Sequence, residues 1–269
     1  MTTTYIAWTD ANKNLNVQPV PTGQQATISN QSSNQGPALA FYKGLLYLAW
    51  TGTDGRINVI SSSNGTSWTG QVTTGEHSNS APALIASSDS LSLVWTGTDG
   101  QLNAIFSSDG KTWMNQVTLN LTTDLAPASA AGPFEVQAIA WTGAGGVLNT
   151  LSGIAIGAES AVALKPTSKQ EPALAFYKGV LYIAWTDDTG NLNVMSSSDG
   201  INFVNQVSIN QSSNSGPALT ASSGSLSLAW TDANGKLTVS SSSDGKTWDP
   251  PTTVNQMSSL TPALAVADF

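Results

Sequence analysis

The chain has 269 residues, of which 40% are hydrophobic and 10% are charged, and its formal net charge is -8. This acidic balance repels phosphate backbones, so we expect no nucleic-acid partner, and the absence of cysteine excludes disulfides and thiolate metal sites. No stretch approaches the roughly 18 apolar residues that span a bilayer, so we expect a soluble protein with no membrane insertion. The first residues lack the basic start and the apolar run of a signal peptide. We therefore expect the protein to be cytoplasmic or released by a non-classical route.

The chain begins with a short segment, YIAWTD, whose tryptophan recurs throughout the sequence. Ala-Trp-Thr or Val-Trp-Thr contains Trp8, Trp50, Trp95, Trp141, Trp185 and Trp230. The tripeptide Pro-Ala-Leu, once altered to Pro-Ala-Ser, recurs every 45 residues at Pro37, Pro82, Pro127, Pro172, Pro217 and Pro262. That interval is the size of one four-stranded propeller blade. The repeat therefore predicts a single all-β domain over residues 1–269, a six-bladed β-propeller with about 45 residues per blade.

The repeat that begins at Gly36 shows its strands most clearly. Residues 45–51, LLYLAWT, are apolar on both faces, as expected for a strand between neighbouring blades. Residues 67–74, SWTGQVTT, are more polar and fit an exposed sheet edge. Asp-Gly or Asn-Gly pairs supply the positive backbone angles of hairpin turns at 54–55, 64–65, 99–100, 109–110, 199–200 and 244–245.

A second motif occupies the third turn of four repeats. It reads SSNGTSW at 62–68, SSDGKTW at 107–113 and 242–248, and SSDGINF at 197–203. It resembles the Asp box of sialidases, usually Ser-x-Asp-x-Gly-x-Thr-Trp, although glycine here follows the acid directly and Asn64 replaces one Asp. Together with PALAFYKGxLYxAWTG, the box makes the chain similar to bacterial sialidase-like six-bladed propellers of the lectin type. The resemblance implies a structural box on the face away from the ligand.

The last repeat is split between the two ends of the chain. Pro262, in TPALAVADF, has no tryptophan after it, and Trp8 has no proline before it. We therefore expect the C-terminal strand and the N-terminal strands to share one blade and to close the ring.

The composition argues against sialidase activity. Sialidases of the resembling kind clamp the substrate carboxylate with three arginines, whereas Arg56 is the single arginine of this chain. His77 has no cysteine partner and no histidine-rich spacing exists, so we expect no metal and no cofactor. A two-carboxylate glycosidase stays an alternative, but the acids near the tryptophans recur from blade to blade. Such repetition favours many equivalent sites over one active centre, and we expect no catalytic residues.

Carbohydrate binding asks for a flat aromatic surface and short polar side chains, and each repeat offers both. Along the usual path of a propeller, the loop between the second and third strands and the loop between blades lie on one face. The candidate sugar-binding residues are Trp8, Asp10, Asn16, Trp50, Asp54, Asn58, Trp95, Asp99, Asn103, Trp185, Asp187, Asn193, Trp230 and Asp232, with Asn34, Asn79 and Asn214 approaching from the loops between blades.

Each of these residue types also has a structural interpretation. The tryptophans could form core between blades, the third-strand asparagines could satisfy buried backbone groups, and the aspartates could be turn formers. The blade around Trp141 has Ala144 and Gly145 where other blades carry an acid, and residues 150–166 contain no box; we expect this blade to bind no sugar.

The sequence favours a non-enzymatic, multivalent lectin with glycan or glycoconjugate partners and sites in clefts between blades. The alternative of another class is a propeller scaffold that binds a protein. The sameness of the repeats argues against the scaffold, because a protein epitope is usually irregular. The sequence assigns no oligomeric state and no particular sugar.

Overall fold

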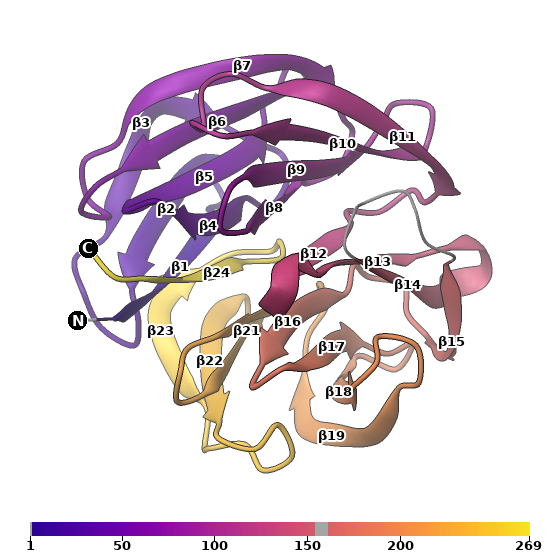
Figure 1. Ribbon diagram of the computed structural model, residues 1–269. Coiled ribbons are helices and arrows are strands. Elements are labelled where there is room, and N and C mark those ends of the chain that lie inside the picture. Colours follow the sequence, from indigo (N-terminus) through magenta and orange to yellow (C-terminus); the bar gives the residue numbers. More distant parts are fainter. Residues whose placement is uncertain (1, 154–160) are drawn as a thin grey trace.

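The computed structural model describes residues 2–153 and 161–269, and within them six four-stranded antiparallel sheets are arranged as blades around a central axis (Figure 1). Blade 1 has the strand order β24 (Ala263–Ala267), β1 (Thr3–Thr9), β2 (Asn14–Pro19), β3 (Ala26–Ser32). Blade 2 is β4 (Ala38–Tyr42), β5 (Leu45–Thr51), β6 (Arg56–Ser62), β7 (Thr69–His77), and blade 3 is β8 (Ala83–Ala86), β9 (Leu91–Thr96), β10 (Gln101–Ser107), β11 (Met114–Thr122). The predicted fold is confirmed.

The other three blades follow the same path from the axis outward. Blade 4 is β12 (Ala128–Ala131), β13 (Gln137–Thr142), β14 (Val147–Gly153), β15 (Val162–Thr167), with the short 3-10 turns η1 (Pro133–Glu135) and η2 (Ala144–Gly146). Blade 5 is β16 (Ala173–Tyr177), β17 (Val180–Thr186), β18 (Asn191–Ser197), β19 (Val204–Ser212). Blade 6 is β20 (Ala218–Ala221), β21 (Leu226–Thr231), β22 (Lys236–Ser242), β23 (Thr252–Met257). Part of the blade 4 segment that lacks a box, residues 154–160, lies outside the described residues.

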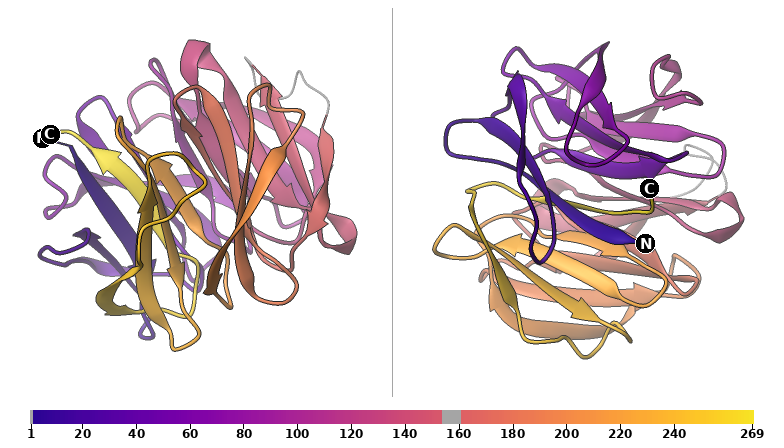
Figure 2. Two further views of the ribbon diagram at one scale, coloured as in Figure 1. Left: turned by 90° about the horizontal axis from the view of Figure 1, so that it is seen from below. Right: turned by 90° about the vertical axis from the view of Figure 1, so that its left-hand side faces the viewer.

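The ring closes through blade 1, as predicted. β24 pairs antiparallel with β1, with Thr3 opposite Ala267 and Ala7 opposite Ala263. The two chain ends consequently lie side by side (Figure 2). Closure leaves each inner strand paired, and the exposed edges are the outermost strands of the blades.

Burial follows the sequence pattern within a blade. In β5 every residue after Leu45 is buried, because both faces of this strand contact neighbouring blades. The outer strand β7 alternates between exposed and half-buried residues. Residues with positive φ interrupt the outer strands at Gly70, Gly75, Asn115, Asn120, Asn205 and Asn210. The pairing register shifts there, and such bulges make an exposed edge a poor template for another strand.

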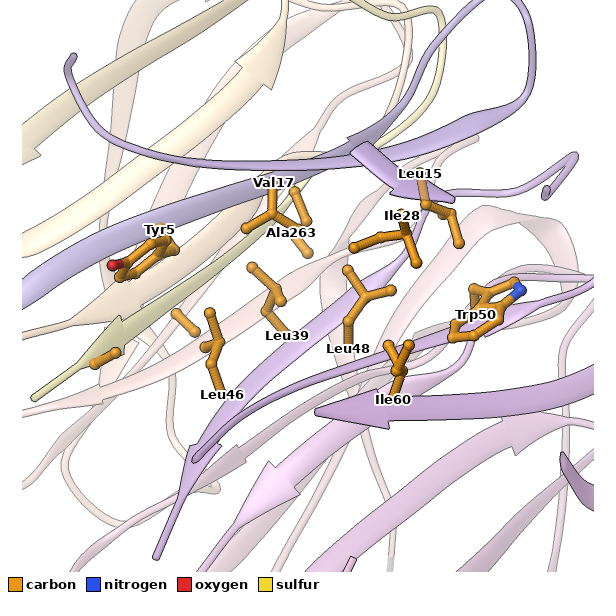
Figure 3. Packing of buried hydrophobic residues seen from close by; sticks show 13 residues of the cluster. Tyr5, Leu15, Val17, Ile28, Leu39, Leu46, Leu48, Trp50, Ile60 and Ala263 are labelled. Atoms are coloured by element: carbon orange, nitrogen blue, oxygen red, sulfur yellow. The ribbon is translucent and has the colours of Figure 1, made fainter. Parts of the chain in front are cut away.

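The core lies between blades rather than in one central mass. Figure 3 shows the boundary of blades 1 and 2, where Trp50 lies beside Ile28, Leu48 and Ile60. Comparable clusters of buried residues fill the other boundaries. The packing that holds neighbouring blades together is therefore repeated around the ring.

A hydroxyl latch also joins each blade to the next. The serine or threonine four residues before each proline donates its hydroxyl, at 2.7–2.9 Å, to the carbonyl of the threonine that follows the next blade's tryptophan: Ser33 to Thr51, Ser78 to Thr96, Thr123 to Thr142, Ser168 to Thr186, Ser213 to Thr231 and Ser258 to Thr9. The latch positions the loops on one face of the ring.

Among the described residues, no helix is long and apolar enough to cross a membrane.

Candidate functional site

Two sets of loops meet on one face of the ring, which we call the loop face. They are the turns between the second and third strands of each blade and the segments that lead to the next blade. The Ser78 N–H donates to the Gly55 carbonyl at 2.9 Å, and the Thr123 N–H donates to the Gly100 carbonyl at 3.0 Å. The box turns follow the third strands at the opposite ends of the blades. This arrangement is the one that the repeat predicted.

The six repeated tryptophans do not present their rings to solvent on this face. Trp8, Trp50, Trp95, Trp141, Trp185 and Trp230 are each at most 3% exposed. Each lies on the second strand of a blade and packs against a neighbouring blade. A ring buried in this way has no free face against which a sugar could stack. The structure therefore corrects the stacking interpretation: these residues are core between blades.

The third-strand asparagines are buried and bonded within the protein. Asn16, Asn58, Asn103 and Asn193 each donate to the carbonyl two residues earlier, at 2.9–3.0 Å. The Asn58 side-chain carbonyl accepts a hydrogen bond from the Thr73 hydroxyl at 2.7 Å, and Asn103 accepts one from Thr118 at 2.7 Å. Their amide groups therefore tie the turn to the outer strand, which matches the structural alternative.

The aspartates of the second turns cap backbone N–H groups. Asp10 accepts from the N–H groups of Asn12 and Asn14 at 2.8 and 2.9 Å. Burial alone would raise the pKa of Asp10, but these bonds together with those from the side chains of Asn14 and Asn16 hold it below its usual value. Asp54, Asp99, Asp187 and Asp232 make the same kind of turn contact. The turn-forming role is thus present in every one of these five turns.

The three asparagines of the inter-blade loops are exposed on the loop face: Asn34, Asn79 and Asn214. The backbone carbonyl of Asn79 accepts a hydrogen bond from the Gln35 side chain at 2.8 Å, which joins this loop to the preceding one. Of the candidates from the sequence, these three and the outer turn acids are the ones that a ligand could reach.

A cleft of about 440 Å³ opens on the loop face between blades 3 and 4. Its walls are the turns of both blades and the segments that follow them: Asp99, Gly100, Thr122–Leu125, Thr142–Gly146, Ser168 and Lys169. Asp99, Asp124 and Lys169 are exposed and supply charge, while Leu125 adds an apolar surface. Of these residues, the sequence analysis named Asp99 as a sugar-binding candidate, and Ala144 and Gly145 as positions that lack an acid. The signal for the cleft was the unusual turn of blade 4, whose small residues leave the space.

In the box turns on the opposite face, the side-chain acceptors are hydrogen-bonded to backbone N–H groups of the same turns. Asp109 accepts hydrogen bonds at 2.8 Å from the N–H groups of Thr112 and Lys111, and these bonds hold its pKa at about 2. Asp244 is held at a pKa of about 2 in the same way by Thr247 and Lys246. Asn64 takes the equivalent contacts through its amide oxygen, so the turn needs an acceptor rather than a charge.

The single arginine and the single histidine of the chain lie on the two outer strands of blade 2. No group of three or more His, Asp or Glu residues within 2–153 and 161–269 is arranged to hold a metal ion. Arg56 is exposed on β6, and its nearest carboxylate is that of Asp54 in the adjoining turn, at 3.8 Å. His77 is the exposed last residue of β7.

Solved structures similar to this chain include lectins and a sialidase, all at low sequence identity. The fucose-specific lectin from Aleuria aurantia has a TM-score of 0.73 at 11% identity, covering 94% of this chain and 91% of that one. A chain of a nidogen/laminin complex has a TM-score of 0.63 at 12% identity, with coverage of 99% and 98%. A mutant Trypanosoma rangeli sialidase has a TM-score of 0.58 at 15% identity, covering 93% of this chain and 52% of the sialidase. No protein family and no curated protein matches the sequence. The likeness establishes a six-bladed propeller fold that lectins share.

Proposed function

We propose that the protein is a carbohydrate-binding lectin and that the cleft between blades 3 and 4 is its principal sugar site. The cleft carries the proposal: it is a recess of about 440 Å³, walled by hydroxyls, carboxylates and an amine, on the loop face of a propeller. Fucose-binding propeller lectins recur among the similar structures, which makes fucosides the first sugars to test.

The lining suits a polyhydroxylated ligand. Carboxylates such as Asp124 accept from two neighbouring sugar hydroxyls, and the Lys169 ammonium donates to ring or hydroxyl oxygens. Leu125 and the backbone of the Gly143–Gly146 turn offer the apolar contact that the buried tryptophans cannot. This proposal replaces the expectation that the Trp141 blade binds no sugar, because the missing acid is also what hollows the surface.

The remaining inter-blade positions serve as weaker, related sites in this proposal. Exposed Asn79 and Asn214 lie in their inter-blade loops, and the Ser78–Gly55 hydrogen bond joins the first loop to the turn of Asp54. The buried tryptophans and third-strand asparagines act there as supports of the loops. Several weak sites on one rigid face would raise affinity for clustered glycans by about 10² to 10⁴ over a single sugar.

Calorimetric titration with α-methyl fucoside, after a glycan array has ranked other sugars, tests the principal site. Asp124→Asn removes the carboxylate, and Gly145→Asn fills the cleft while keeping a residue type that tolerates positive φ. We expect each change to weaken binding about tenfold, since a hydrogen bond to a charged group contributes about 1.5–3 kcal/mol. Asp89→Asn, on an exposed hairpin at the other end of blade 3, is the matched control.

The same titration discriminates between the function classes. Unchanged affinity in both cleft variants would place the site elsewhere on the face. Hydrolysis of fluorogenic glycosides, lost in Asp124→Asn, would favour the two-carboxylate glycosidase instead; both acids of the cleft are exposed, whereas a general acid of that class usually sits in a desolvated pocket. A protein that binds no glycan on the array would favour the protein-binding scaffold.

A further inference from the structure

A recess lies between blades 6 and 1, toward the face of the ring that carries the box turns. In blades 2, 3 and 6 the box glycine packs on a tyrosine of the preceding blade; a Cβ on Gly65, for example, would lie 2.4 Å from the Tyr5 ring. Blade 1 has no box, and its third turn folds back on itself, since a Cβ on Gly23 would lie 2.7 Å from the Pro19 ring. Ser227 of blade 6 also stands at the position of these tyrosines, so the boundary is hollowed here.

The walls of this recess are largely apolar. Val20 and Pro21 line it from blade 1, and Val239 and Pro250 line it from blade 6. Each of these four residues is half-buried or exposed, so their side chains are open to a ligand. The volume is about 340 Å³, and small-molecule sites have roughly 300–1,000 Å³. The recess is therefore large enough for a six-membered ring with its substituents.

Asp249 is the one charged residue among the described residues that line the recess. Its backbone N–H donates to the Ser241 carbonyl at 2.8 Å, and its backbone carbonyl accepts from the Ser240 hydroxyl at 2.7 Å. One carboxylate oxygen accepts from the Ser241 hydroxyl at 2.5 Å, and the other accepts no hydrogen bond from a described residue. The end of β22 thus holds this exposed acid in place and leaves one of its oxygens for a cation.

Three hydroxyl groups complete the lining. They belong to Thr4 of blade 1 and to Ser227 and Thr252 of blade 6. None of these residues is fully buried. Because a hydroxyl both donates and accepts, such groups suit the hydroxyls of a polyhydroxylated ligand. The recess therefore combines a carboxylate, several hydroxyls and an apolar wall.

We propose that this recess binds a protonated amino sugar and is a second sugar site, separate from the loop-face cleft. The ammonium group binds the Asp249 carboxylate, the sugar hydroxyls bind Thr4, Ser227 and Thr252, and the apolar face of the ring packs on the valines and prolines. The net charge of -8 favours a cation over an anion. An amino sugar offers the cation, the hydroxyls and the apolar ring face in a single ring of matching size.

The same three features separate this ligand from its near relatives. Glucose and N-acetylglucosamine have the ring and the hydroxyls but no charge for Asp249. Cyclohexylamine has the ring and the charge but no hydroxyls for Ser227 and its neighbours. Because a hydrogen bond between two charged groups is stronger than one between neutral groups, the expected order of affinity is glucosamine, then cyclohexylamine, then the two neutral sugars.

Calorimetry with these four compounds tests the proposal on the full chain at about pH 6, where amines of this kind are protonated. Asp249→Asn keeps the shape and the acceptor for Ser241 and removes the charge; we expect it to weaken glucosamine about tenfold and to leave glucose unchanged. Ser227→Tyr introduces the residue that blades 1, 2 and 5 have at this position, and it should abolish binding by filling the recess. Asp89→Asn, an exposed acid on a hairpin of blade 3 at the same face, is the matched control.

Melting curves verify that each variant keeps its fold, and Asp249→Asn carries the test by itself if Ser227→Tyr does not fold. The proposal is overturned if N-acetylglucosamine binds as tightly as glucosamine, if Asp249→Asn binds glucosamine as the unaltered chain does, or if none of the four compounds binds at millimolar concentration. Loss of glucosamine binding in Asp124→Asn instead would assign the amino sugar to the loop-face cleft and would equally overturn it. Titration of α-methyl fucoside on the same variants reports on the loop-face cleft separately, so failure of one site is distinguishable from failure of the other.

Discussion

The second turns of blades 3 and 4 are closed by the same backbone hydrogen bonds but differ in side chains and in the φ of one residue. In blade 3 the Gly97 N–H donates to the Gln101 carbonyl at 2.8 Å, and in blade 4 the Gly143 N–H donates to Val147 at 2.8 Å. Asp99 caps its turn through the Gln101 N–H, whereas Gly145 takes a φ of 69° and has no atom within 4 Å of where a Cβ would lie. The hydrogen bonds that close the turn therefore persist without the acid, and the place of its side chain is open space.

The two blades share the buried packing and the latch that hold the ring together, and they differ in the side chains of an exposed turn. Trp95 and Trp141 are buried alike in the two blades, and a latch hydroxyl joins each blade to its neighbour. The repeated elements are thus equivalent even where the surface is not. Changes in the shared frame should have large and equal effects in both blades.

Deletion of residues 261–269 should have the largest effect on this frame. It removes β24, the inner strand of blade 1, and leaves β1 with an unpaired edge. We expect calorimetry to show no cooperative unfolding transition. The whole ring loses closure, so blades 3 and 4 should be destabilised together. A truncated chain that melts within a few degrees of the full one would contradict closure through blade 1.

Replacement of the tryptophans compares the two blades directly. Trp95→Ala and Trp141→Ala should each lower the free energy of unfolding by about 3–5 kcal/mol, because both remove a buried ring from an inter-blade cluster. Denaturant titration measures the change. A loss confined to one of the two would show that the blades do not share the same frame, and an unchanged stability in Trp95→Ala with lost sugar binding would restore the stacking interpretation.

Removal of single latch hydroxyls should have a smaller effect. Ser78→Ala and Thr123→Val leave the carbonyls of Thr96 and Thr142 without these donors, and we expect about 1–2 kcal/mol of destabilisation from each. Thr123→Ser, which keeps the hydroxyl, is the control. Equal losses at both positions are expected; a loss several times larger at Thr123 would mean that blade 4 depends on its latch more than blade 3 does.

Lowering the pH should have the smallest effect on stability, through the aspartates of the box turns. The pKa values of Asp109 and Asp244 are lowered to about 2 in the folded protein from the usual 3.8, so these groups stabilise the fold above pH 4 and lose that contribution as the pH falls toward 2. Asp109→Asn with Asp244→Asn should flatten the dependence of the melting temperature on pH in this range. Blade 2, whose box has Asn64, shows that the amide fits the turn. An unchanged pH profile would mean that other carboxylates control acid unfolding.

The fold could be predicted from the sequence because its determinants are local and repeated. Each proline, each Asp-Gly pair and each apolar run has the same meaning in successive blades, and the split repeat at Trp8 and Pro262 leaves closure as the consistent arrangement. The latch was not predicted: threonine follows each of the six repeated tryptophans, but the hydroxyl donor four residues before each proline is recognised only once the blades are placed side by side.

The candidate site was less predictable for a physical reason. Whether Trp50 faces a sugar or another blade depends on how closely the blades approach, which no spacing along the chain encodes. A cleft is likewise defined by what is absent: Ala144 and Gly145 carry no chemistry of their own, yet their small size shapes the surface. Sequence patterns mark the groups that can act, and packing decides which of them a ligand can reach.

The latch between Ser258 and Thr9, which joins residues 249 positions apart, has a consequence for how the chain is made. During synthesis β1, β2 and β3 emerge before the other strands of the ring, but they cannot complete their sheet until β24, the last strand of the ring, has left the ribosome. The first blade to be translated is therefore the last to be finished. Because all six latches are alike, a circular permutant cut at another inter-blade loop would move this waiting period to a different blade and keep the ring.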